Sequence, residues 1–505
     1  MNVEFINFVA FIFFKTLSLL SILGFGNFIN KNIIIFKINL ELKNLIFIYG
    51  LIFLGFIFII INFFFPISNF YSILTIIFGS TLYSYYFFKK DNRKNEFFFI
   101  LITLIFSSFY SFYAGLSDDF NYHYETIKNF KNQNLFEILH HRTISYNSHW
   151  LFLSSIFNIS YFTSTLFILT SLFFSIFIYD LFNLSYGILK NRSNYLSIIS
   201  FLFLIFFLGV LNNYKDLGTD IPGVIVCFYV LIIIIHFIFD EKLKNLNEIF
   251  LLILLLVYFS IIVKVTNALV VLFLFFLLFK ISFKKLNFFK ILLFSLFPLA
   301  WLFQNFIISG CLIWPISITC IYNVDLAINE SYLIESFAKG DISTTMEVNS
   351  FTWINIWVTN HLNKMLEIYL AYIVILIIPI LYLLFKKENI KKILIKFLKE
   401  KYFDFNYKLL LLIIIICNVV WFLNAPAYRF GIFYNLLFIF FSILPFWIFL
   451  FEKSFNFITI YSKVIFILIC IYFIFENINK IDWYNKRYDM WPPILKEELL
   501  KRKNF

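Results

Sequence analysis

Residues 249–263 read IFLLILLLVYFSIIV, and Lys264 separates this run from a second one, VTNALVVLFLFFLLF, at residues 265–279. A helix crosses a bilayer with about 20 apolar residues, so the stretch is too long for one span, and we expect two short helices that meet at Lys264. Of the 505 residues, 62% are hydrophobic and 14% charged, and the mean hydropathy is +0.88. Soluble domains carry about a quarter charged residues. The composition therefore indicates an integral membrane protein.

Similar apolar runs recur along the whole chain and predict an all-α, polytopic transmembrane helix bundle. We expect about 14 spans, within a range of about 12–15. Hydropathy places them near residues 4–27, 44–66, 70–88, 97–113, 150–183, 195–211, 221–239, 248–263, 265–280, 290–308, 366–386, 408–424, 428–451 and 461–477. Residues 1–477 then form a single transmembrane domain, with interfacial helices in its outer loops, and 478–505 form a basic C-terminal tail.

The net charge of +12 is distributed in a way that argues against nucleic-acid binding. One set of alternate loops holds 25 Lys and Arg residues, and the opposite set holds eight. The basic set comprises the loops around 28–43, 89–96, 184–194, 240–248, 280–290, 386–408 and 452–463. By the positive-inside rule these loops are cytoplasmic, and the two large loops 114–149 and 309–365 lie outside. The C-terminal tail does not fit the positive-inside rule, because an even number of spans leaves its seven basic residues outside.

The first outer loop opens with two adjacent carboxylates, in the stretch SDDFNYHY at residues 117–124. Acidic residues at membrane depth are costly, so Asp118 and Asp119 are candidate catalytic residues; a plain hydrophilic loop is the alternative. Apolar residues recur at helical spacing over 120–130, which predicts a short amphipathic helix on the membrane surface. Capping of this helix explains one of the two carboxylates and leaves the second unexplained.

Arginine is the rarer cation, with six Arg against 35 Lys. On the predicted outer face, only Arg142 and Arg429 occur outside the tail. The planar guanidinium binds a phosphate or carboxylate through two hydrogen bonds, which an ammonium cannot do. We therefore expect an anion at both residues; an interfacial cation that extends toward water is the alternative for each.

Asp220 and Lys264 belong to the same predicted face. Asp220 stands just before Pro222 at the start of a predicted span, so helix capping explains it as well as ligand binding does. Lys264 follows a wholly apolar run, and we expect it to pair with an anion or to extend outward.

The five cysteines are scattered without CxxC spacing, which argues against a metal site and against a disulfide framework. They are Cys227, Cys311, Cys320, Cys417 and Cys470. Cys311 and Cys320 share a loop, so a bond between them is the one pairing left open.

The order of these features resembles the GT-C class of membrane glycosyltransferases, which includes bacterial aminoarabinose and protein mannosyl transferases. Those enzymes carry acidic residues in their first large outer loop, followed by an interfacial helix. Within that class, the sequence is similar to a poorly characterised bacterial branch. The resemblance covers roughly residues 110–320 and 421–431. It rests on Asp118 and Asp119, Arg142, Asn147 to Trp150, Asp220 with Pro222, Asn305 with Ser309 and Gly310, and Ala425 to Gly431. Gln304 departs from the pattern, because the branch has an arginine there.

The resemblance implies a transferase of a bacterial inner (plasma) membrane. It would move a sugar from a polyprenyl-phosphate donor to a lipid, glycan or protein acceptor. Asp118 or Asp119 would act as general base, and direct displacement would invert the anomeric carbon. Lys264, Arg142 and Arg429 are the candidates to hold the phosphate, and His123 or His141 could add a hydrogen bond; Asn147 and Asp220 complete the expected binding residues. No cofactor is expected, although an acidic pair could instead bind a divalent cation.

Two other classes remain open. A polysaccharide polymerase or ligase would be expected to carry arginines in its large outer loop, whereas 309–365 contains none. A transporter of lipid-linked sugars predicts internal repeats and charges in mid-span, and only Lys15 lies clearly inside a predicted span.

Overall fold

The computed structural model describes residues 3–34, 42–90, 93–110, 122–138, 144–159, 163–189, 195–209, 218–239, 246–278, 286–340, 351–386 and 405–485. Every regular element within these ranges is a helix, which confirms the predicted all-α class.

The α-helices, in chain order, are α1 (Val3–Ile29), α2 (Lys43–Phe64), α3 (Asn69–Phe88), α4 (Arg93–Tyr110), α5 (Tyr124–Asn132), α6 (His149–Phe157), α7 (Ile168–Leu189), α8 (Tyr195–Gly209), α9 (Asp220–Phe239), α10 (Leu246–Val263), α11 (Leu272–Leu278), α12 (Phe288–Ser309), α13 (Val324–Ala338), α14 (Trp353–Trp357), α15 (Asn363–Phe385), α17 (Phe405–Asn424), α18 (Ile432–Lys453) and α19 (Phe455–Asn485). Short 3₁₀ or π segments are η1 (Asn30–Ile34), η3 (Ile144–Tyr146), η4 (Thr163–Phe167), η6 (Val265–Val271), η8 (Ser317–Thr319), η9 (Val358–Leu362) and η11 (Tyr428–Phe430).

Ten helical segments of the described chain are long and apolar enough to cross a membrane. They lie in α1, α2, α7, α9, α10, α12, α14 with α15, α17, α18 and α19; α8 and η6 with α11 are apolar but shorter. Large apolar side chains stay exposed on several of these helices, for example Phe303 on α12, Leu370 on α15 and Phe475 on α19. Surfaces of this kind are stable against lipid and unfavourable in water. The chain is therefore an integral membrane protein with multiple spans.

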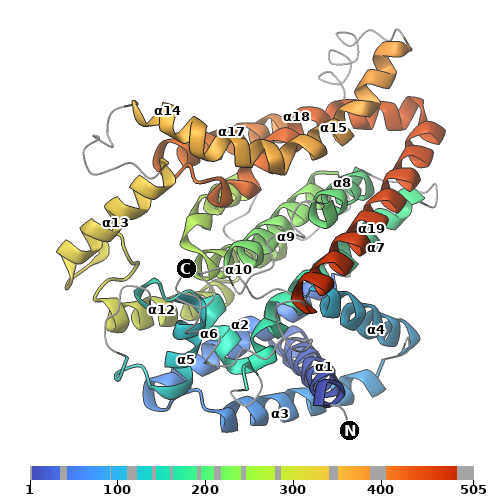
Figure 1. Cartoon of the computed structure of the whole chain (residues 1–505). Helices are drawn as coiled ribbons and strands as arrows, with labels where there is room; N and C mark the ends of the chain where they lie inside the picture. The colour runs from blue at the N-terminus through green and yellow to red at the C-terminus, as the bar shows by residue number, and fades with distance from the viewer. Residues whose placement is uncertain are drawn as a thin grey trace.

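The central helices are α8, α9 and α10, and the others pack around them (Figure 1). The N-terminal helix α1 packs against α2 and α3, and α7 contacts α4, α8 and α9. At the other side of the view, α18 packs against both α15 and α17. Because α9 is surrounded on most sides, the residues at its two ends meet several other elements.

Two boundaries differ from the predicted ones, and a third agrees. The expected span 150–183 is broken: α6 ends at Phe157, and η4 and α7 follow from Thr163. The expected break at Lys264 is observed between α10 and η6. The last helix, α19, continues through Asn485, so the first part of the expected tail is helical, and 486–505 lie outside the described residues.

The predicted amphipathic helix near 120–130 corresponds to α5 in its described part. Ile127 and Phe130 on its apolar face are fully buried, and Glu125 is exposed. The carbonyl of Phe130 accepts a hydrogen bond from the backbone of Ile67, 2.9 Å away, in the turn between α2 and α3. This contact holds α5 against the end of α2 and the start of α3.

Candidate functional site

Asp220 and Lys264 form an ion pair where α9 begins and α10 ends. Asp220 is the first residue of α9, and Lys264 is the extended residue between α10 and η6. Their side chains are only 22% and 11% exposed, respectively. Two charges in such surroundings stabilise each other, because neither is fully hydrated. Of the two expectations for Lys264, pairing with an anion is the one observed.

Arg429 approaches this pair from the turn between α17 and α18. Its guanidinium carbon lies 5.4 Å from the ring centre of Phe337 on α13 and 5.4 Å from that of Phe430. The ring of Phe430 also lies 4.6 Å from the ammonium nitrogen of Lys264. Cations are attracted to the faces of aromatic rings, so Phe430 links the two cations.

His123 reaches the same place from the start of α5. Its side chain is buried, and its ring centre lies 4.8 Å from that of Tyr122. Lys264, Arg429 and His123 all interact electrostatically with the carboxylate of Asp220. Four of the predicted site residues, from loops far apart in the sequence, therefore lie together at one end of the helices.

Tyr428 forms part of the surroundings of this cluster. Its ring centre lies 6.1 Å from that of His361 and 5.6 Å from the ammonium of Lys364. Burial raises the pKa of the Tyr428 hydroxyl, Arg429 opposes the rise, and Asp220 adds to it. Residues of η9 and α15 thus pack against the turn that carries Arg429.

Asn147 holds the first outer loop to α12. It adopts a positive φ of 34°, a conformation that asparagine tolerates better than most residues. Its amide nitrogen donates to Oδ1 of Asn305 at 2.7 Å, and its carbonyl accepts from the indole of Trp301 at 3.0 Å. The next residue, Ser148, donates its hydroxyl to the carbonyl of Val263 at 2.8 Å, directly before the lysine of the ion pair. These bonds position the loop; contact of Asn147 with a substrate stays a prediction.

Asn305, Ser309 and Gly310, which form one of the motifs of the glycosyltransferase resemblance, shape the end of α12. The amide nitrogen of Asn305 donates to the carbonyl of Leu312 at 3.0 Å, and Ser309 donates to the carbonyl of Asn305 at 2.8 Å. Gly310 ends the helix with φ 78°, and a Cβ at this position would lie 2.8 Å from Tyr322. Gln304, which replaces the expected arginine, is fully buried, and its amide has no hydrogen-bond partner among the described residues.

Cys311 and Cys320 form a disulfide, which is the one pairing that the sequence left open although the cysteine spacing argued against disulfides in general. The left-handed turn at Gly310 reverses the chain, and the backbone of Leu312 then donates to the carbonyl of Thr319 at 3.0 Å. This antiparallel contact brings the two cysteines together, and spacing alone does not reveal it. Structural disulfides persist in oxidising compartments, so the bond supports placing this loop outside the cytoplasm.

One link between the two outer loops was missed by sequence reasoning. The hydroxyl of Tyr146 donates to the carboxylate of Glu330, which is buried on α13. The ring centre of Tyr122 lies 6.0 Å from that of Tyr146. Sequence placed both loops on one face but gave no signal for which residues would meet, because Glu330 belongs to no motif.

Asp118, Asp119, His141 and Arg142 lie outside the described residues. In the sequence, Asp119 is three positions before Tyr122, so the candidate bases belong to the segment that leads into α5. Within the described part of the chain, no group of three or more His, Cys, Asp and Glu residues is arranged to hold a metal ion. The roles of the four residues and the divalent-cation alternative stay predictions.

Fold and site together define an all-helical, multi-span membrane protein with a largely buried cluster of charged residues at one end of its helices. The chain matches the family model described as Domain of unknown function (DUF8201) over residues 9–436, and it belongs to that family. No curated protein and no solved structure matches it.

Proposed function

We propose that this protein is a GT-C-type glycosyltransferase of a bacterial plasma membrane. It transfers a sugar from a polyprenyl-phosphate donor to an acceptor hydroxyl at the outer face. The observation that carries the proposal is the gathering of Lys264, Arg429 and His123 around Asp220, next to the helix that follows Asp118 and Asp119.

The charge of this cluster suits a departing lipid phosphate. The cluster contains two permanent cations, Lys264 and Arg429, and the carboxylate of Asp220 neutralises one of them. The three residues therefore carry a net charge of about +1. The sugar donor is a phosphodiester with one negative charge, whereas the released phosphate monoester carries about −1.5 to −2 at pH 7. A fixed positive site therefore stabilises the departing group more than the intact donor, and this difference lowers the barrier.

The reaction needs one proton acceptor and one anion site. Asp118 or Asp119 takes the proton of the acceptor hydroxyl as its oxygen attacks the anomeric carbon. The bond from that carbon to the phosphate oxygen breaks, and both electrons of the bond leave with polyprenyl phosphate. Arg429 and Lys264 hold the phosphate, His123 donates a hydrogen bond to it, and attack opposite the leaving group inverts the anomeric centre.

The membrane arrangement follows from the same proposal. The chain crosses the bilayer about 14 times, with α3, α4, α8 and η6–α11 as additional spans. The helices α5 and α13 lie along the outer interface, and the polyprenyl tail of the donor stays within the bilayer.

The test replaces the candidate bases. Asp118→Asn, Asp119→Asn and the double variant are expected to lower turnover of a polyprenyl-phosphate sugar by about 10²–10⁴-fold, because a general base contributes about that much. Donor binding should persist, since the phosphate contacts remain. The measurement is release of polyprenyl phosphate by purified protein, together with donor binding to each variant.

Glu125→Gln is the matched control, because Glu125 is an exposed carboxylate of the same loop on α5. It should leave turnover unchanged. Wild-type turnover in the double Asn variant would refute the proposed transferase mechanism. Unchanged donor consumption with accumulation of long chains would favour a polymerase instead.

A further inference from the structure

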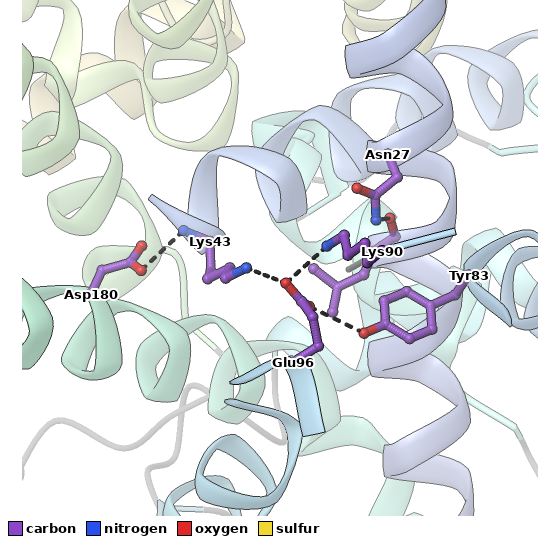
Figure 2. Close-up of polar contacts among 7 residues, drawn as sticks. Asn27, Lys43, Tyr83, Lys90, Glu96 and Asp180 are labelled. Atoms are coloured by element: carbon purple, nitrogen blue, oxygen red, sulfur yellow. Dashed lines mark hydrogen bonds and ion pairs between the residues drawn. The ribbon is translucent and has the colours of Figure 1, made fainter. Parts of the chain in front are cut away.

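A second charged cluster lies at the opposite ends of the helices, where α2 and α4 begin and α3 ends. Figure 2 shows Lys43 and Lys90 pointing toward Glu96 from two sides. One oxygen of Glu96 contacts the ammonium groups of both Lys43 and Lys90, the latter at 2.8 Å. The other oxygen accepts from the hydroxyl of Tyr83 at 3.3 Å. A single carboxylate thus serves two ammonium groups.

Asp180 is the other carboxylate nearby, and its oxygens accept hydrogen bonds mainly from backbone N–H groups. The backbone nitrogens of Lys43 and Asn44 donate to it at 3.0 and 2.9 Å, and the hydroxyl of Tyr229 donates to it at 2.9 Å. Figure 2 shows the contact with Lys43. These bonds satisfy the free N–H groups at the start of α2 and anchor that helix to α7. Asp180 therefore serves mainly to hold the helix start.

The cluster carries more positive charge than its carboxylates neutralise. A third ammonium, that of Lys31 in η1 directly after α1, lies 4.7 Å from the ring centre of Tyr86. Burial lowers the pKa of Lys90, Glu96 opposes this, and the neighbouring charges of Lys43 and Lys31 lower it further. The loops 28–43 and 89–96 together contain seven basic and three acidic residues. Confined positive charge of this kind is stabilised by an anion.

The surface beside the cluster is the outward, apolar side of α3 and α4. Phe88, Phe97 and Phe98 are 65%, 59% and 57% exposed and directly adjoin the charged loop. An anion that fits this place has an apolar body next to a negative head. Inner leaflets rich in anionic lipid attract basic segments at membrane ends, with about 1 kcal/mol for each Lys or Arg near the surface.

We propose that Lys31, Lys43 and Lys90 bind the phosphate headgroup of an anionic phospholipid of the cytoplasmic leaflet, whose acyl chains lie along α3 and α4. Glu96 holds two of the ammonium groups in place between the helix ends. Bound lipid would join the ends of α1, α2, α3 and α4 and stabilise this part of the bundle. The site is independent of the proposed transferase reaction.

The test measures thermal unfolding and lipid binding of the full-length protein in detergent. Phosphatidylglycerol, phosphatidylcholine and inorganic phosphate are added separately. Wild-type protein should gain several degrees in Tm with phosphatidylglycerol, and much less with the other two. Each lysine is expected to contribute about fivefold to the affinity, so Lys31→Gln/Lys90→Gln should weaken phosphatidylglycerol binding by roughly 25-fold.

The matched control is Lys408→Gln/Lys463→Gln, which removes two exposed lysines of the same predicted face from α17 and α19. This control variant should keep the wild-type affinity for phosphatidylglycerol and the wild-type gain in Tm. Equal stabilisation by both lipids, an equal effect of inorganic phosphate, or an equal loss in the control pair would each overturn the site. If the double variant does not fold, Lys90→Gln alone takes its place, with about a fivefold loss expected and unchanged affinity as the contradicting result.

Discussion

Arg429 is held more firmly than an ordinary surface arginine. Two aromatic rings, those of Phe337 and Phe430, lie at the same 5.4 Å from its guanidinium carbon. Rings at this distance restrict the plane of the group and partly exclude water from it. Restriction of that kind is useful to a group that binds a phosphate in one orientation, and it has little use in a cation that only extends toward water.

Replacement of Arg429 separates these two roles. If the guanidinium binds the donor's phosphate, Arg429→Ala should lower kcat/KM by about 10²–10³-fold, as loss of a transition-state hydrogen-bond donor does. Arg429→Lys should be almost as impaired, because an ammonium does not reproduce the two parallel bonds. Arg93→Lys, an exposed arginine at the other end of the helices, is the control. Full activity of Arg429→Lys would leave Arg142 and Lys264 to hold the leaving group.

Sequence could predict which residues share a face but not which of them touch. Lys264, Arg429, Asp220 and His123 were assigned to one face from loop charge alone, and the structure brings them together. Their direct pairing was not predictable, because it depends on which helices are neighbours. For the same reason, the bond from Tyr146 to α13 had no sequence signal.

At the scale of elements, α5 docks through a buried lysine. The ammonium of Lys131 donates to the hydroxyl of Ser72 on α3 at 2.8 Å, and the side chain is only 5% exposed. Burial lowers the pKa of Lys131 to about 7. Near neutral pH, the folded protein therefore begins to release a proton that the unfolded chain retains up to a pH of about 10.4.

This difference predicts the direction of a pH effect. Below pH 7, Lys131 is charged in both states and its burial is fully unfavourable. As pH rises above 7, only the unfolded state keeps the proton, so stability rises, by at most about 1.4 kcal/mol per pH unit. Lys131→Met removes the contribution. The Tm difference between variant and wild type should therefore shift in favour of wild type from pH 6 to pH 9. A difference that stays constant with pH would contradict the lowered pKa.

Helix breaks were predictable where a charge caused them and hidden where small polar residues did. Lys264 interrupts an apolar run and was expected to separate two helices, as it does. The break after Phe157 has no charge: Thr165 donates its hydroxyl to Asn158 at 2.9 Å and accepts from the backbone of Ile159 at 3.1 Å. These side chains satisfy the backbone inside the bundle, so the helix can break there without a charged residue.

At the scale of the whole molecule, the two charged clusters occupy opposite ends of the helices. Asp220, Lys264 and Arg429 come from loops counted as outer, and Lys43, Lys90 and Glu96 come from loops counted as inner. In each cluster, the residues that contact one another come from loops that the alternation of spans assigns to the same side of the membrane. The proposed orientation, with the Arg429 cluster outside, rests on two separate arguments, the Lys and Arg distribution and the Cys311–Cys320 disulfide.

Single-cysteine labelling of intact cells tests this orientation. Asn424 and Lys94 are exposed at opposite ends of the bundle, next to the turn that carries Arg429 and in the first turn of α4. Asn424→Cys should react with an impermeant maleimide added outside, and Lys94→Cys only after the cells are permeabilised. Background should be low, because Cys227 and Cys417 are buried and Cys470 is half-buried. The reverse pattern would put the arginine cluster in the cytoplasm, where the disulfide would be reduced, and would exclude an outer-face transferase.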